Sequence, residues 1–104
     1  MDISKVDWKL YRERVSDWQE HYMEKLTEEY VKLLTSPGNA SDHFWELEKR
    51  IKRDKKHPGI LIELRKSTAI WDIAYFVRDK VITMDELEGF SEDLIDAVKL
   101  ILSR

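Results

Sequence analysis

Lysine and arginine side chains are concentrated between residues 49 and 66, where they could neutralise phosphates and bind nucleic acid. A solvated surface helix is the alternative, because Glu46 and Glu48 stand four residues before Arg50 and Lys52, a spacing that favours ion pairs. The net charge of −3 also disfavours nucleic acid. The candidate residues are Lys49, Arg50, Lys52, Arg53, Lys55, Lys56, Arg65 and Lys66.

Carboxylate and imidazole groups are the second possible source of chemistry. His21 lies one helical turn from Asp17 and Glu24, but Trp18 stands where a di-iron helix would carry a glutamate. Residues 79–87 resemble the second half of a calcium-binding loop, yet the earlier acidic ligands and the glycine are missing. We therefore expect no metal site and read residues 83–86 as the start of a helix.

Catalytic motifs are missing from the sequence. It has no cysteine, only three glycines, no glycine-rich phosphate loop and no nucleophile with a recognisable base. Disulfides and thiolate metal sites are excluded by composition, and we expect a protein that is not an enzyme and needs no cofactor.

A long helix near the N-terminus would position these groups, and an apolar stripe in the sequence predicts it. Its members recur every three or four residues, and no Gly or Pro interrupts the segment before Pro37. The spacing predicts one helix over about residues 6–35, roughly 45 Å long, whereas a compact domain of this size is about 33 Å across. The stripe consists of Trp8, Tyr11, Val15, Trp18, Tyr22, Leu26, Tyr30 and Leu33.

Such a stripe must be covered along its whole length. Either the fold is elongated, or a second chain covers the part that extends beyond it. Because Trp and Tyr are favoured at binding hot spots, we expect an interaction module, a homodimer or a complex with another protein, whose interface includes the first helix. The candidate interface residues are Trp8, Tyr11, Val15, Trp18, Tyr22 and Tyr30.

Turn signals divide the rest of the chain. Pro37 and Gly38 end the first helix. The second helix is capped by Asn39, Ser41 or Asp42 and ends near Lys56. Its apolar face consists of Phe44, Leu47 and Ile51. Pro58 is compatible with the first turn of a third, central helix. Residues 60–62 could instead form a short strand, but no other segment offers a pairing strand. The polar run 65–68 is a possible kink or break.

The C-terminal third shows clear capping signals. Thr83 and Glu86 form a capping box, Gly89 fits a left-handed turn, and Ser91 begins the last helix. We predict an all-α fold, an elongated bundle of four to five helices with a long N-terminal helix, in one domain over residues 1–104.

Charge is unevenly distributed along the chain. Residues 1–35 carry −2, residues 36–66 carry +3, and residues 67–104 carry −4. The basic middle and the acidic C-terminal third are therefore expected to face each other, within one chain or between two. The N-terminus has no secretory signal, and the most apolar stretch, residues 60–82, contains seven charged side chains, so we expect a cytoplasmic protein without a membrane span.

Two stretches, DWQEHYMEKL at residues 17–26 and FWELEKRIK at residues 44–52 continuing toward Ser67, are similar to a known group of sequences. They resemble small uncharacterised helical proteins that are encoded in prophages and mobile elements of Gram-positive bacteria. The resemblance implies a cytosolic accessory protein of unassigned activity, and it carries over no functional residue.

Overall fold

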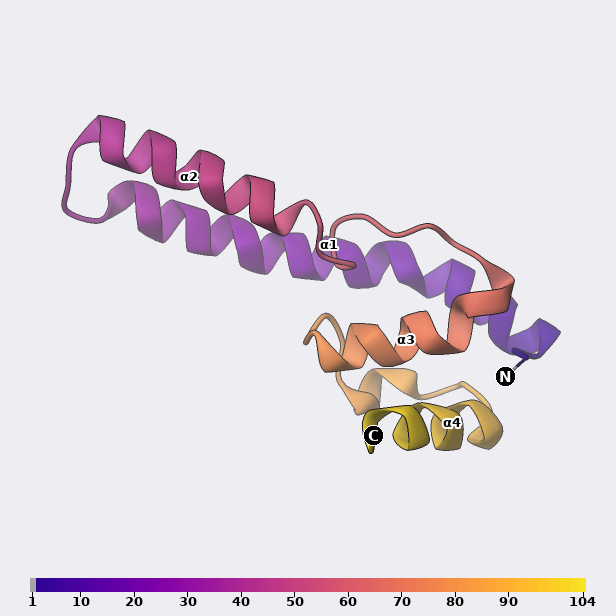
Figure 1. Cartoon of the computed structure of the whole chain (residues 1–104). Coiled ribbons are helices and arrows are strands. Elements are labelled where there is room, and N and C mark those ends of the chain that lie inside the picture. Colours follow the sequence, from indigo (N-terminus) through magenta and orange to yellow (C-terminus); the bar gives the residue numbers. More distant parts are fainter. Residues whose placement is uncertain (1) are drawn as a thin grey trace.

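The computed structural model describes residues 2–104, and in that range every regular element is a helix (Figure 1). The four α-helices of this range are α1 (Lys5–Thr35), α2 (Ala40–Asp54), α3 (Ala69–Arg78) and α4 (Glu92–Leu102). Two short 3₁₀ turns, η1 (Lys66–Thr68) and η2 (Met84–Leu87), precede α3 and α4. The predicted all-α fold with a long N-terminal helix is confirmed.

The long helix α1 is unbroken over its 31 residues. Ser4 caps its N-terminus, where the hydroxyl oxygen accepts a hydrogen bond from the backbone N–H of Asp7 at 3.1 Å. The molecule measures 52 × 23 × 22 Å and has a radius of gyration of 16.5 Å. A compact chain of this length would have a radius of gyration of about 13 Å, so the fold is elongated along α1.

The hydrophobic core lies at one end of the molecule, where α3, η2 and α4 pack against the N-terminal half of α1 (Figure 1). The Trp18 ring meets the Phe76 ring edge to face, with centroids 5.9 Å apart. We call this part the body. Its buried side chains include Tyr11, Val15, Trp18, Ile73, Ala74, Phe76, Leu87, Phe90, Leu94 and Val98.

A buried carboxylate joins the two ends of the chain. Asp7 on α1 accepts hydrogen bonds from the backbone N–H of Ser91, at 3.0 Å, and from the Ser91 hydroxyl. The same hydroxyl oxygen accepts from the backbone N–H of Leu94 and caps α4, as predicted for Ser91. One side chain of α1 therefore positions the start of the last helix.

The turn before α4 also forms as predicted. Thr83 and Glu86 make the capping box, and Gly89 adopts a φ of +97°, which a residue with a side chain rarely takes. Arg14 of α1 donates hydrogen bonds to the carbonyl oxygens of Glu86 and Glu88. The turn is thus held against α1 through its backbone.

The expectation that a third helix starts near Pro58 is wrong. Residues 61–65 form an extended strap that runs along α1, and α3 begins only at Ala69, after the turn η1 (Figure 1). The reason is the distance that the connecting segment must span. The helix α2 ends alongside the middle of α1, and the chain must return toward the start of α1 before α3 begins. An extended chain covers about 3.3 Å per residue and a helix about 1.5 Å.

Within one chain, the basic residues of α2 lie away from the acidic helix α4, whereas Arg65 and Lys66 of the basic middle lie beside the body. The helix α2 lies beside the far half of α1, away from α4 (Figure 1). All ion pairs found among residues 2–104 join residues at most four apart in the sequence. No helix in this range is long and apolar enough to cross a membrane.

Replacing Asp7 with alanine removes the acceptor for both Ser91 donors, the backbone N–H and the hydroxyl. We expect the free energy of unfolding to fall by about 2–3 kcal/mol, since the hydrogen bonds are made to a charged group. Urea unfolding followed by tryptophan fluorescence measures this. The matched control is Asp2→Ala at an exposed position; equal stability of the two variants would contradict the role of Asp7.

Candidate interface on the α1–α2 hairpin

The C-terminal half of α1 and the whole of α2 form an antiparallel hairpin that projects beyond the body (Figure 1). This hairpin has almost no core of its own. The only buried residue of α2 is Asp54, and the only buried apolar residue of α1 beyond Trp18 is Leu26, which is not part of the body's core cluster. The 15-residue amphipathic helix α2 therefore packs against one helix only, the C-terminal half of α1.

A polar contact fixes how the two helices of the hairpin align. The Tyr30 hydroxyl donates a hydrogen bond to the buried carboxylate of Asp54, which also accepts from Nε of Arg53 at 3.1 Å. Burial of the Tyr30 ring, together with its hydrogen bond to Asp54, raises the pKa of Tyr30 to about 12. The register of α1 against α2 is set by this pair.

The base of the hairpin is fixed by the turn that follows α2. The Tyr22 ring stacks on the His57 ring, with centroids 4.5 Å apart and planes inclined by 3°. Nε2 of Gln19 donates to the carbonyl oxygen of Pro58 at 3.0 Å. Gly59 is buried so close to Tyr22 that an added Cβ would lie 2.5 Å from the ring. These contacts hold the turn after α2 against α1.

Two apolar hollows, of about 210 and 320 Å³, open on one side of the hairpin. The first lies between Met23 and Thr27 of α1 and Ile51 of α2, and the second runs along α2 from Phe44 to Ile51. Ile51 borders both, so the hollows form one continuous surface, which we call the groove face. Its residues are Met23, Leu26, Thr27, Tyr30, Phe44, Leu47, Glu48, Ile51, Lys52, Asp54, Lys55 and Ile60.

The groove face has a regular spacing on both helices. Met23, Thr27, Tyr30 and Leu34 recur at steps of four, three and four residues, and the same steps separate Ala40, Phe44, Leu47 and Ile51. Such spacing is that of a coiled-coil seam, in which a partner helix covers the stripe. Here the stripes are open: the exposed fractions are 46% for Leu34, 61% for Phe44 and 38% for Ile51.

This second stripe on α1 is the signal that sequence reasoning missed. The stripe predicted as an interface serves the chain's own packing: Tyr11, Val15 and Trp18 are buried in the body, and half-buried Trp8 packs against it. Tyr22 lies under the turn after α2. Tyr30 alone borders the groove face. The assignment of the buried residues to an exposed interface is corrected, because α3, α4 and the turn cover them.

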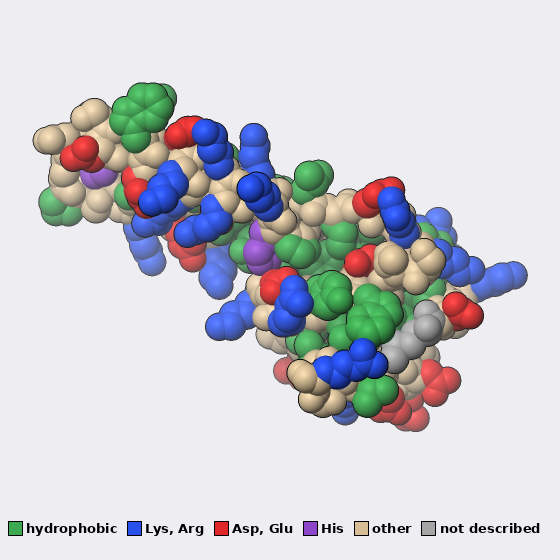
Figure 2. All heavy atoms as spheres, in the orientation of Figure 1, with side chains coloured by type: hydrophobic (Ala, Val, Ile, Leu, Met, Phe, Trp, Pro, Cys, Tyr) green, Lys and Arg blue, Asp and Glu red, His purple; other side chains and the backbone are tan. Residues whose placement is uncertain are grey.

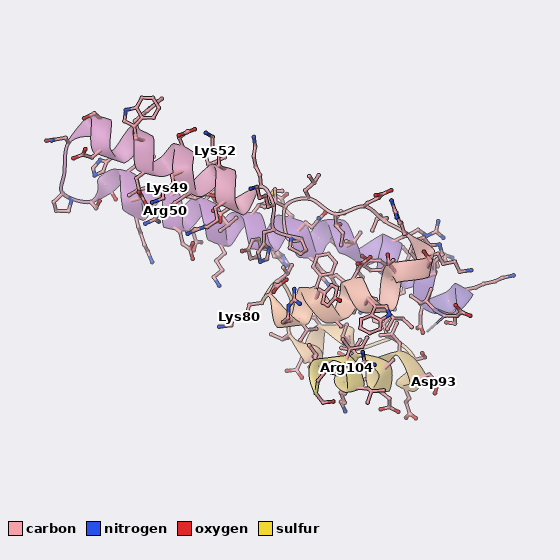
Figure 3. The ribbon with its side chains drawn as sticks, in the orientation of Figure 1. Lys49, Arg50, Lys52, Lys80, Asp93 and Arg104 are labelled. Atoms are coloured by element: carbon pink, nitrogen blue, oxygen red, sulfur yellow. The ribbon has the colours of Figure 1, made fainter. Side chains whose placement is uncertain are left out.

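The basic candidates are divided by the fold. Lys and Arg side chains gather over the hairpin on the face seen in Figure 2, and Lys49, Arg50 and Lys52 project from α2 in Figure 3. Arg65 and Lys66 lie at the other end of the strap, beside the body (Figure 1). Local carboxylates pair with Arg50, Lys52, Arg53 and Arg65, including the predicted Glu46–Arg50 and Glu48–Lys52 pairs.

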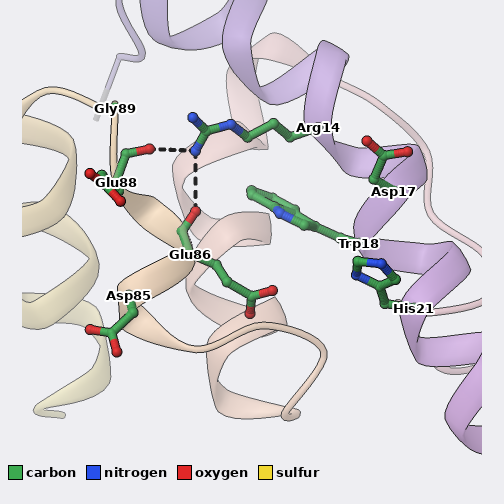
Figure 4. Close-up of a pocket in the computed structure, with 8 residues that line it drawn as sticks. All are labelled: Arg14, Asp17, Trp18, His21, Asp85, Glu86, Glu88 and Gly89. Atoms are coloured by element: carbon green, nitrogen blue, oxygen red, sulfur yellow. Dashed lines mark hydrogen bonds between the residues drawn. The ribbon is translucent and has the colours of Figure 1, made fainter.

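The histidine candidate lies in a separate hollow of about 690 Å³, next to the turn after η2 (Figure 4). Asp17 and His21 line it on α1, and Asp85, Glu86 and Glu88 line it on the opposite side. Across residues 2–104 no three His, Asp or Glu side chains are grouped so that they could hold a metal ion. Arg14 also lines this hollow and donates hydrogen bonds to the carbonyl oxygens of Glu86 and Glu88 (Figure 4).

Comparison with known proteins gives no relative. No protein-family model matches the chain, and neither a curated protein nor a solved structure matches it.

Replacing Tyr30 with phenylalanine leaves the Asp54 carboxylate without one of its donors. We expect the free energy of unfolding to fall by about 2 kcal/mol at neutral pH, because the lost hydrogen bond is charge-assisted. Urea unfolding measures it, with Tyr75→Phe on α3 as the control.

The same contact should weaken at high pH. A hydroxyl whose pKa rises to about 12 on folding stabilises the fold fully below its ordinary pKa of 10.0 and loses that contribution as the pH passes through 12. The stability difference between wild type and Tyr30→Phe should therefore shrink over this pH range. A difference that stays constant up to pH 12 would contradict the assigned role of the hydroxyl.

Proposed function

We propose that this chain is a non-enzymatic protein-interaction module that binds an α-helical surface through the groove face of its α1–α2 hairpin. One observation carries the proposal: α2 has an apolar stripe at seam spacing, and none of its apolar side chains is buried. A helix in a folded protein is stabilised chiefly by burial of its apolar face. The hairpin is therefore a binding surface presented at a distance from the body.

The groove face has the composition of a helix-binding surface. Phe44 stands edge to face with Trp45 at 5.0 Å between centroids, which places two large rings at the exposed end of the hairpin. Burying one Leu, Ile or Phe side chain stabilises a complex by about 1.5–3 kcal/mol before the entropy of association is subtracted. Phe44, Leu47 and Ile51 are the apolar side chains that would anchor a partner helix.

The groove face is also held rigid before a partner binds. The Tyr30–Asp54 hydrogen bond sets the register of the two helices, and the stacked rings of Tyr22 and His57 fix the base of the hairpin. Because the two stripes are already aligned, binding loses little further conformational entropy. The body supplies the anchor from which the hairpin projects.

A photoreactive benzoylphenylalanine in place of Phe44 tests the proposal in the native host cell. We expect irradiation to give a discrete cross-linked species whose partner, another protein or a second copy, is identified by mass spectrometry. The matched control carries the same residue in place of Lys49, on the outer side of the same helix. Adding Ile51→Glu should abolish the adduct and leave the helical circular dichroism unchanged, since Ile51 is exposed in the free chain.

Absence of any adduct at position 44, or equal adducts at positions 44 and 49, would contradict the module. The first result would show that no protein occupies the groove face. The second would show only random collision with exposed side chains.

Nucleic-acid binding by α2 is a second candidate. Lys49, Lys52, Arg53 and Lys56 recur at helical spacing on one side of the helix, and all four are exposed. Against it stand the carboxylates already paired with Lys52 and Arg53. Fluorescence anisotropy with duplex DNA at low salt tests this function. Binding of the DNA should weaken steeply as the salt concentration rises, and the double variant Lys49→Glu/Lys56→Glu should not bind. No binding at low salt would exclude this function.

A further inference from the structure

We propose that the occupant of the groove face is a second copy of this chain, placed by a two-fold axis that runs parallel to α1 and α2. The inference rests on the proposed function and names its partner. In the resulting four-helix bundle, α1 of each copy faces α2 of the other, and the two bodies lie at the same end.

The groove face points away from the body, so a second copy can reach it. Trp18 points from α1 into the body. Met23 follows five residues later, and at 3.6 residues per turn this places it about 140° further round the helix. The body and the groove face therefore lie on different sides of α1.

The spacing on the two helices suits a partner with the same spacing. Each hairpin presents two stripes with steps of four, three and four residues, joined by the short connection at residues 36–39. Two such hairpins supply the four stripes of an antiparallel four-helix bundle, whose core is built from positions of this kind. A single helix from another protein would cover only part of a face that is two helices wide.

Charges on the two edges of the groove face specify the arrangement. Glu20 and Glu24 stand three residues before Met23 and Thr27, on the outer edge of α1. Glu48, Lys52 and Lys55 border the hollow on the α2 side. Glu48 pairs with Lys52 at 2.7 Å, so Lys55 supplies the positive charge of this edge. Met23 and Lys55 line the same hollow, so the acidic and basic edges lie at the same level along the hairpin.

A two-fold axis parallel to the helices exchanges the two edges at that level. Each acidic edge of α1 then meets the basic edge of the partner's α2. An axis perpendicular to the helices would instead place α1 against α1 and α2 against α2, which gives no such pairing. The charge pattern therefore favours the parallel axis.

The size of the surface predicts a weak dimer. The face spans about 17 residues of helix and two helix widths, or about 25 × 18 Å. Two copies then bury roughly 900 Å² of flat area, close to the lower limit of about 1,000 Å² for specific interfaces. We expect a monomer–dimer equilibrium with a dissociation constant in the micromolar range.

Sedimentation equilibrium from about 5 to about 500 µM tests the dimer over the expected range of affinity. Wild type should associate, and Phe44→Glu and Ile51→Glu should each remain monomeric with unchanged helical circular dichroism. Lys49→Glu is the matched control on the outer side of α2 and should associate as wild type does. A wild-type chain that stays monomeric throughout would overturn the second copy as the occupant.

The axis is tested by charge exchange. Glu24→Lys should raise the dissociation constant at least about tenfold by opposing the partner's Lys55, and adding Lys55→Glu should restore it. If the double variant is as weak as Glu24→Lys alone, the two edges do not meet and the proposed arrangement is wrong.

Disulfide trapping gives an independent test, because the natural chain has no cysteine. A mixture of Glu24→Cys and Lys55→Cys chains should form the 24–55 disulfide between copies under mild oxidation. Dominant 24–24 and 55–55 disulfides would overturn the parallel axis. The two proposals fail separately: a monomeric chain whose position 44 cross-links another protein overturns the dimer alone, whereas a chain that cross-links nothing overturns the module as well.

Discussion

The structure depends on one constraint: α1 has to support two different packing partners along its length. Its N-terminal half buries Tyr11, Val15 and Trp18 against α3 and α4, and its C-terminal half supports α2. The first partner is large and closes a core, whereas the second is a single helix. The molecule is therefore stable at one end and leaves apolar surface open at the other.

Polar contacts set the geometry on both halves. Asp7 ties α1 to Ser91 at the start of α4, and Tyr30 ties α1 to Asp54 at the end of α2. Each contact buries a carboxylate and satisfies it with hydrogen bonds, so each is specific in position as well as favourable. The result is a hairpin whose two helices are aligned by one of these contacts and a body whose last helix is positioned by the other.

Sequence reasoning located most elements but not which apolar residues the chain itself covers. The stripe from Trp8 to Tyr30 correctly predicts the helix α1, yet a stripe on one helix does not show whether its cover comes from the same chain. The sequence predicts a third helix that starts too early, because Pro58 is compatible with a helix start as well as with a turn. The extended strap follows from the distance between the end of α2 and the start of α3, and local sequence does not encode that distance.

The amino-acid sequence by itself determined the helical class, the length of α1, the capping of the last two turns by Thr83 and Ser91, and the local ion pairs of α2. These features depend on residues at most a few positions apart. Only the tertiary structure decided which apolar stripe is covered and which stays open, and that Arg65 and Lys66 part from the other basic residues. Burial depends on where distant segments lie, so periodicity alone can mark a stripe without saying what covers it.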